Sequence, residues 1–249
     1  MAAGLFADRA DAGRLLGEQV ARLDLPNALV VALPRGGVPV GAEVARRLGA
    51  PLLALPVGKI GAPGREELAI GAVAPEGVKV LNHDVIAALR LRDDQVETMV
   101  SKAAAKVARQ LELYRGNTET TSLHGRSVVV VDDGLATGAS MWAALIAVRG
   151  QHPLGLVLAV PVAPPEALAS LAPLVDVEVC VFRPAHMQAV GAWYEDFSQT
   201  TDREVTELLV EFGSEPAASA GSADCSNRTD RSDRTDRSDR TASAANPTK

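Results

Sequence analysis

The chain has 249 residues, of which 47% are hydrophobic and only 3% aromatic, and its formal net charge is −6. This composition predicts a globular core of small aliphatic side chains, and the acidic charge argues against a general nucleic-acid or anionic-membrane surface. Two cysteines are too few for a disulfide framework. No apolar run reaches the ~18 residues of a membrane span and no secretory leader is evident, so we expect a cytoplasmic protein.

Helix and strand signals alternate along the body of the chain, which favours an α/β fold with a parallel sheet. Glycine and proline are frequent over residues 58–77, and we expect that stretch to be largely irregular, with strand signals at 68–73 and 78–81 that would pair as a hairpin. In chain order, the remaining pattern predicts a helix over 8–23, a strand over 28–33, a helix over 38–48, a strand over 51–57, a helix over 93–114, a strand over 128–131, a helix over 141–148, a strand over 156–160, a helix over 164–171, a strand over 175–182 and a helix over 202–212.

The composition changes abruptly after residue 213. From Arg228 to Arg240 the sequence repeats Arg-(Thr/Ser)-Asp, a period that matches neither a helix nor a strand, with almost nothing apolar to bury. We therefore expect a folded domain over residues 1–213 and a disordered low-complexity tail over residues 214–249.

The most informative stretch is 128–140, with the sequence Val-Val-Val-Val-Asp-Asp-Gly-Leu-Ala-Thr-Gly-Ala-Ser. Four β-branched residues predict a strand buried on both faces, and it ends at the carboxylates of Asp132 and Asp133. Small residues then lead directly into a helix. Because backbone N–H groups at a helix start bind phosphate, the stretch predicts a phosphate site flanked by two acids, which several nucleotide-binding folds could provide.

Two earlier stretches could bind further anionic groups. Leu33–Pro39 is again strand, turn and helix; its glycines would let the backbone approach an anion, and Arg35 could donate to two of its oxygens. Taken alone, Pro-Arg-Gly-Gly is more often only a turn. The stretch 57–67 carries Lys59, Arg65 and Glu66, and a segment of this composition is ordinarily an exposed, solvated loop.

In this order, the three stretches resemble the type I phosphoribosyltransferases, and 128–140 is similar to the motif with which these enzymes bind phosphoribosyl pyrophosphate (PRPP). One residue departs from the motif: Gly134 stands where Val, Ile, Leu or Met is usual, which should cost local rigidity. The resemblance implies a parallel-sheet α/β fold with a Rossmann-like core, a flexible loop and a small hood. It also implies a set of site residues: Asp132 and Asp133 for the ribose hydroxyls, Ala136, Thr137, Gly138, Ala139 and Ser140 for the 5′-phosphate, Arg35, Gly36, Gly37 and Lys59 for the pyrophosphate, and Arg65 and Glu66 in the flexible loop.

The irregular stretch 183–199 corresponds to the hood, under which these enzymes bind their acceptor. The resemblance implies that Trp193 or Tyr194 stacks on a planar acceptor. It also implies that Glu195, with Asp196 as its neighbour, reaches a Mg²⁺ ion bound mainly by PRPP. Local packing of the aromatic residues is the alternative, and the sequence leaves both open.

The implied reaction is transfer of the phosphoribosyl group from PRPP to a nitrogenous, nucleobase-like acceptor, with release of pyrophosphate. Ala136 stands where hypoxanthine-guanine enzymes have an aspartate as presumed base, so the acceptor stays open. One alternative is a PRPP-binding regulator without transferase activity. Another is the stand-alone form of a module otherwise fused to a hydrolase, although the chain has no Gly-x-Ser-x-Gly elbow. For partners we expect small molecules and a second copy in a homodimer, with neither a membrane nor nucleic acid.

Overall fold

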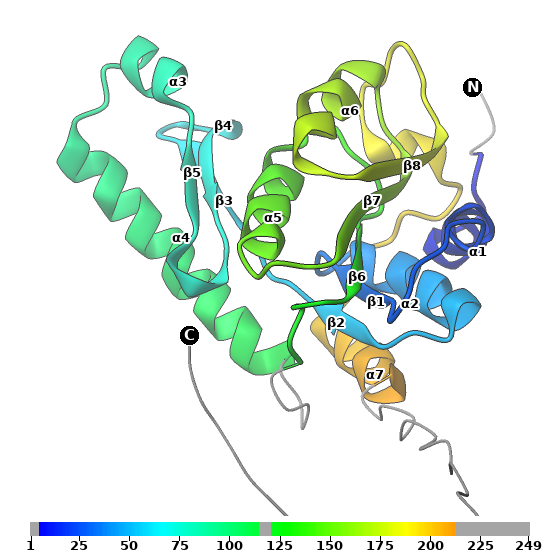
Figure 1. The fold of residues 1–249 in the computed structure, drawn as a ribbon. Helices are drawn as coiled ribbons and strands as arrows, with labels where there is room; N and C mark the ends of the chain where they lie inside the picture. Colours follow the sequence, from blue (N-terminus) through cyan, green and yellow to red (C-terminus); the bar gives the residue numbers. More distant parts are fainter. Residues whose placement is uncertain (1–4, 115–120, 213–249) are drawn as a thin grey trace, which may run out of the picture. The chain divides into compact units, whose positions relative to one another are not determined.

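The computed structural model describes residues 5–114 and 121–212, except for the side chains of residues 65–67, and all of them belong to one compact unit. Its centre is a parallel sheet of five strands in the order β2-β1-β6-β7-β8 (Figure 1). The strands are β1 (Leu29–Ala32), β2 (Leu52–Ala54), β6 (Ser127–Val131), β7 (Gly155–Val162) and β8 (Val177–Phe182). The predicted α/β fold with a parallel sheet is confirmed.

Helices cover both faces of this sheet. Val128 and Val130 of β6 pack with α5 (Ala139–Arg149) and α6 (Pro165–Leu171) on one face. Val129 and Val131 pack on the other face with α1 (Arg9–Val20), α2 (Gly37–Leu48) and α7 (Asp202–Phe212). All four valines are fully buried. Burial on both faces explains why the strand has no alternating polar residues.

A second sheet, antiparallel in the order β3-β4-β5, follows β2 in the chain. It consists of β3 (Gly58–Ala62), β4 (Arg65–Val73) and β5 (Lys79–Leu81), and it packs against α4 (Asp93–Tyr114). The pairing of β4 with β5 confirms the predicted hairpin. The short helices η1 (Pro75–Gly77) and α3 (His83–Ala88) were not predicted.

The prediction of a largely irregular stretch over 58–77 is wrong, because β3 and β4 occupy most of it. Gly64 and Gly77 lie in turns with positive φ, whereas Gly58 and Gly71 lie in strands, where they allow close packing. A Cβ atom on Gly71 would lie 2.3 Å from the carbonyl oxygen of Val80 on the neighbouring strand, and one on Gly58 would lie 3.0 Å from a methyl group of Val107 in α4.

Residues before α1 pair with the stretch that follows the short helix η3 (Val190–Trp193). Phe6 forms a parallel bridge with Tyr194, and the N–H groups of Glu195 and Asp196 donate to the carbonyl oxygens of Phe6 and Ala7 at 2.8 and 2.9 Å. The start of the described chain is thereby joined to the segment between η3 and α7. Nothing in the sequence pattern signals this pairing.

The other helices agree with prediction to within a few residues, and α4 and α7 begin at the predicted residues. The α1 helix begins after Asp8, whose carboxylate accepts the Asp11 N–H at 2.7 Å, and α2 ends at Gly49, where φ is +61°. None of the described helices is both long and apolar enough to cross a membrane. The predicted tail over 214–249 lies outside the described residues, so the domain boundary stays a prediction.

Candidate active site

The candidate site lies where the parallel sheet reverses its strand order. From β1 the chain proceeds to β2 on one side, whereas from β6 it proceeds through β7 to β8 on the other. The two strands pair in parallel, with Leu29 opposite Val128 and Ala32 opposite Val131. Ligands of open α/β sheets bind beyond the carboxyl ends of the strands at such a point. The loops leaving these two ends carry Arg35 to Gly37 and Asp132 to Ser140.

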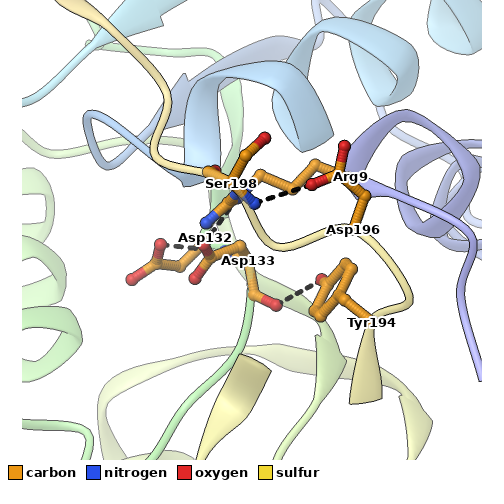
Figure 2. Close-up of polar contacts among 6 residues, drawn as sticks. All are labelled: Arg9, Asp132, Asp133, Tyr194, Asp196 and Ser198. Carbon is orange, nitrogen blue, oxygen red and sulfur yellow. Dashed lines mark hydrogen bonds and ion pairs between the residues drawn. The ribbon is translucent and has the colours of Figure 1, made fainter. Parts of the chain in front are cut away.

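The acidic pair is held by contacts that use one oxygen of each carboxylate. The backbone N–H of Asp133 donates to Oδ1 of Asp132 at 2.8 Å, and Nε of Arg9 donates to Oδ2 of Asp133 at 2.8 Å (Figure 2). Burial raises the pKa of both carboxyls. The charge of Asp133 raises the pKa of Asp132 further, whereas Arg9 partly offsets the effect of burial on Asp133. Hydroxyl donors or a cation next to these two carboxyls would therefore stabilise their ionised form.

The turn after β1 rests directly on this pair. A Cβ atom on Gly36 would lie 2.1 Å from Oδ2 of Asp133, and one on Gly37 would lie 2.9 Å from both the Cα atom of Asp132 and the carbonyl oxygen of Val131. Only a residue without a side chain fits at either position. The peptide bond that enters the turn, Pro34-Arg35, is cis.

The predicted phosphate loop ends at the start of α5. The helix begins at Ala139, and Gly138, with φ at +74°, is its N-cap. Within the described chain no side chain caps this end, so the first N–H groups of the helix can donate to an anion. Ala136 and Thr137 are exposed, Gly138 is buried, and Ala139 and Ser140 are half-buried.

Gly134, the departure from the usual motif, has no room for a side chain. A Cβ atom there would lie 2.6 Å from Cγ1 of Val190 in η3 and 3.0 Å from Cγ1 of Val162 in β7. Val190 thus occupies the space that a side chain at position 134 would need. The hood stretch is thereby packed against the loop that carries the acidic pair.

Tyr194 of the hood is buried and contacts the same loop. Its ring packs against Phe6 and Phe197, with centroids 5.2 and 5.0 Å away, and its hydroxyl donates to the carbonyl oxygen of Asp133 at 2.5 Å. Burial and then the charge of Asp133 raise the pKa of Tyr194, so the hydroxyl stays protonated as a donor. Trp193 is half-buried, and its carbonyl oxygen accepts the N–H groups of Leu5 and Phe6. Acceptor stacking by Trp193 or Tyr194 stays a prediction.

The remaining predicted residues are more dispersed. Nη1 of Arg35 lies 3.9 Å from Oδ1 of Asp202 at the start of α7, and the buried Tyr114 donates its hydroxyl hydrogen to the same oxygen. Lys59 is exposed on β3, in the antiparallel sheet, whose strands β3 and β4 contact α5.

Arg65 and Glu66 open β4, but their side chains lie outside the described ones, so their assignment to a flexible loop stays a prediction. Glu195 and Asp196 are exposed; Asp196 accepts the N–H of Ser198 at 2.8 Å. Within the described residues, no group of three or more His, Cys, Asp or Glu side chains could by itself hold a metal ion.

Arg9 is the site contact that sequence reasoning missed. A weak signal was available: an arginine in the first turn of a helix opposes the helix dipole, which suggests an acidic partner elsewhere in the fold. The partner itself could not be read from the chain, because Asp133 is 124 residues away.

Comparison with known proteins agrees with this geometry. The sequence model of the phosphoribosyl transferase domain matches residues 8–172. Two curated Mycobacterium tuberculosis proteins, from strains CDC 1551 / Oshkosh and ATCC 25618 / H37Rv, are provisionally named phosphoribosyl transferases and are each 42% identical over 220 residues. The match covers 88% of this chain but 49% of those relatives, so the chain spans about half their length.

Among solved structures, TT1426 from Thermus thermophilus is 44% identical and superposes with a TM-score of 0.71, covering 84% of this chain and 99% of that one. The match to the family model spans both loops of the candidate site, which leave the sheet where its strand order reverses. The chain therefore belongs to the phosphoribosyl transferase domain family.

Proposed function

We propose that this protein transfers the 5-phosphoribosyl group from PRPP to a nitrogenous acceptor and releases pyrophosphate. One observation supports it above all others: the acidic pair at the end of β6, the uncapped start of α5 and the turn Gly36–Gly37 converge where the sheet order reverses. A phosphorylated sugar with a second anionic group needs these three kinds of contact side by side.

Each loop has a role in donor binding. Asp132 and Asp133 would accept hydrogen bonds from the ribose 2′- and 3′-hydroxyls through the carboxylate oxygens that the contacts with Arg9 and the Asp133 N–H do not use. The N–H groups at the start of α5, with the hydroxyls of Thr137 and Ser140, would bind the 5′-phosphate. Arg35 and the backbone at Gly36 and Gly37 would take the pyrophosphate.

The reaction is a substitution at the anomeric carbon. A nitrogen of the acceptor forms the new bond, the bond to pyrophosphate breaks with its electron pair leaving on oxygen, and the proton of the attacking nitrogen passes to solvent. The carboxylates beside the ribose would stabilise the positive charge that develops on the ring, and Arg35 and Lys59 the negative charge on the leaving group. Exclusion of water by the segment around β3 and β4 would favour transfer over hydrolysis.

We further propose that the donor binds together with Mg²⁺. The oxygen atoms of Asp132 and Asp133 are ligands of the type that this ion prefers, and their raised pKa values mean that a nearby cation would favour the ionised pair. When bound, Mg²⁺ would neutralise charge on the pyrophosphate oxygens. Direct contacts from Glu195 or Asp196 stay a proposal.

The acceptor is the open part of the proposal. The exposed Ala136 offers no group that could accept a proton from a purine nitrogen, which argues against the 6-oxopurine chemistry of enzymes with an aspartate there. The family and the donor loops support the transfer reaction without naming its acceptor.

Pyrophosphate release tests the proposal. The full chain is mixed with PRPP, Mg²⁺ and a panel of nucleobases and aromatic acids. We expect release that depends on one acceptor class and disappears in Asp133→Asn and Arg35→Ala. Asp94→Asn is the matched control, because Asp94 is an exposed residue of α4 whose carboxylate pairs with the surface residue Arg92.

Two results would count against transfer. Donor binding measured by calorimetry, with no release for any acceptor, would favour the regulatory alternative. Absence of PRPP binding to the wild-type chain would show that the proposal is wrong.

A further inference from the structure

Arg9 occupies an unusual position for a basic residue. It is the first residue of α1, where its positive charge opposes the helix dipole, and only 12% of its side chain is exposed. The unfavourable position at the helix start and the burial of the charge both require compensating contacts. The guanidinium group has three. Nε donates to Asp133 at 2.8 Å and Nη1 donates to the carbonyl oxygen of Ser198 at 2.7 Å (Figure 2). The group also lies 3.9 Å above the ring centre of Phe197.

These contacts point the guanidinium group at one atom of the candidate site. Ser198 and Phe197 belong to the hood side, and together they fix the plane of the group before it reaches Asp133. Oδ2 of Asp133 is the same atom that leaves no space for a side chain on Gly36. Arg9 thus fixes Asp133 at the point where the two donor loops meet.

We propose that Arg9 is a positioning residue for PRPP: it binds Oδ2 of Asp133, so that this carboxylate presents its other oxygen to a ribose hydroxyl. The inference rests on the proposed function. Arg9 itself needs no contact with the donor. Its role differs from that of a general cation near the acidic pair, because Nη1 and one face of its guanidinium group are bound to the hood.

The contacts around Asp133 show how the role can be measured. Asp132 faces it from the same loop, Arg9 from α1 and the Tyr194 hydroxyl from the hood. Among these groups Arg9 is the one that binds a carboxylate oxygen of Asp133, since the Tyr194 hydroxyl donates to its backbone carbonyl oxygen. A positioning role therefore predicts a loss of PRPP affinity that is out of proportion to any loss of thermal stability.

Three single variants separate position from charge. Arg9→Gln removes the charge and the stacked plane. Arg9→Lys keeps the charge, but an ammonium group cannot reproduce the fork that reaches Asp133 and Ser198 together. Arg14→Gln is the control: Arg14 is on the same helix, 57% exposed and paired with Asp11. PRPP binding to the full chain with Mg²⁺ is measured by calorimetry at one neutral pH, together with the melting temperature of each variant.

We expect Arg9→Gln to weaken PRPP binding by about 10- to 100-fold, as for loss of a charge-assisted hydrogen bond. Arg9→Lys should weaken binding less, and Arg14→Gln should change neither the affinity nor the melting temperature. If Arg9→Gln does not fold, Arg9→Lys still tests the geometry, because its affinity should fall by about tenfold although the charge is kept.

Unchanged PRPP affinity in both Arg9 variants would overturn the inference. Tighter binding by Arg9→Gln would also overturn it, because Arg9 would then compete with the donor for Asp133. If the wild-type chain binds no PRPP, the failure belongs to the proposed function and is recognised before any variant is compared.

Discussion

Replacing Gly36 with alanine tests whether the glycine is required by the acidic pair or by the backbone. Gly36 has φ at −62° and ψ at −34°, which alanine adopts easily, so the backbone alone would gain about 0.4–1 kcal/mol from the change. The new Cβ atom would however lie 2.1 Å from Oδ2 of Asp133, more than 1 Å inside normal contact. The carboxylate must move, and its hydrogen bond with Arg9 is lost, at about 1.5–3 kcal/mol.

The net expectation for Gly36→Ala is a loss of about 1–2 kcal/mol, or roughly 2–8 °C in melting temperature for a domain of this size. A displacement of about 1 Å at a binding group should also reduce PRPP affinity by tenfold or more. The matched control is Gly150→Ala, because Gly150 has φ at −61° and its nearest neighbours to a Cβ atom are carbonyl oxygens at 3.5 Å. Calorimetry and thermal melting of both variants decide the matter. An unchanged melting temperature with unchanged affinity in Gly36→Ala would refute the reasoning.

Two further substitutions follow from the same loop. Asp132→Asn keeps an oxygen that can accept the Asp133 N–H but removes the charge. Because the folded pKa of Asp132 is raised, ionisation of this carboxyl destabilises the fold increasingly as the pH rises above the unfolded pKa of about 3.9. The variant should therefore melt about 2–8 °C higher than the wild type at pH 7, and the difference should disappear near pH 4, whereas a gain that is independent of pH would contradict the assignment. Gly134→Val restores a residue usual in the motif but places Cβ 2.6 Å from Cγ1 of Val190, so the free energy of unfolding in a denaturant titration should fall by about 1–3 kcal/mol. A Val variant as stable as the wild type would show that the hood stretch is not packed as described.

The sequence was sufficient to predict the parallel sheet and the strand-turn-helix units after β1 and β6, because each rests on local patterns. Four consecutive valines require cover on both faces, and a strand followed by acids, small residues and a helix has few alternative structures. The α4 helix is predicted correctly because its apolar stripe repeats over 22 residues. Periodicity within one segment is thus enough to predict a helix or strand, whatever other segment it packs against.

What the pattern could not provide are contacts between distant segments. The glycines of β3 and β4 resemble turn signals in the sequence, whereas Gly71 is needed because β5 approaches it closely. The glycines after β1 are predicted to admit an anion, and the structure adds that Gly36 must also admit Asp133. Arg9 and the hydroxyl of Tyr194 contact Asp133 through pairings that no spacing in the sequence encodes.

The contacts of Arg9 also bear on how the protein reaches its native state. Arg9 pairs with Asp133 across 124 residues and with Ser198 across 189 residues, whereas the strand pairs of the parallel sheet join residues 20 to 99 positions apart. Contacts of such sequence separation carry the largest loop-closure cost and form late. The sheet can therefore be complete while the crevice is still open, so PRPP binding during refolding should lag behind the recovery of helical signal and report the final step of folding.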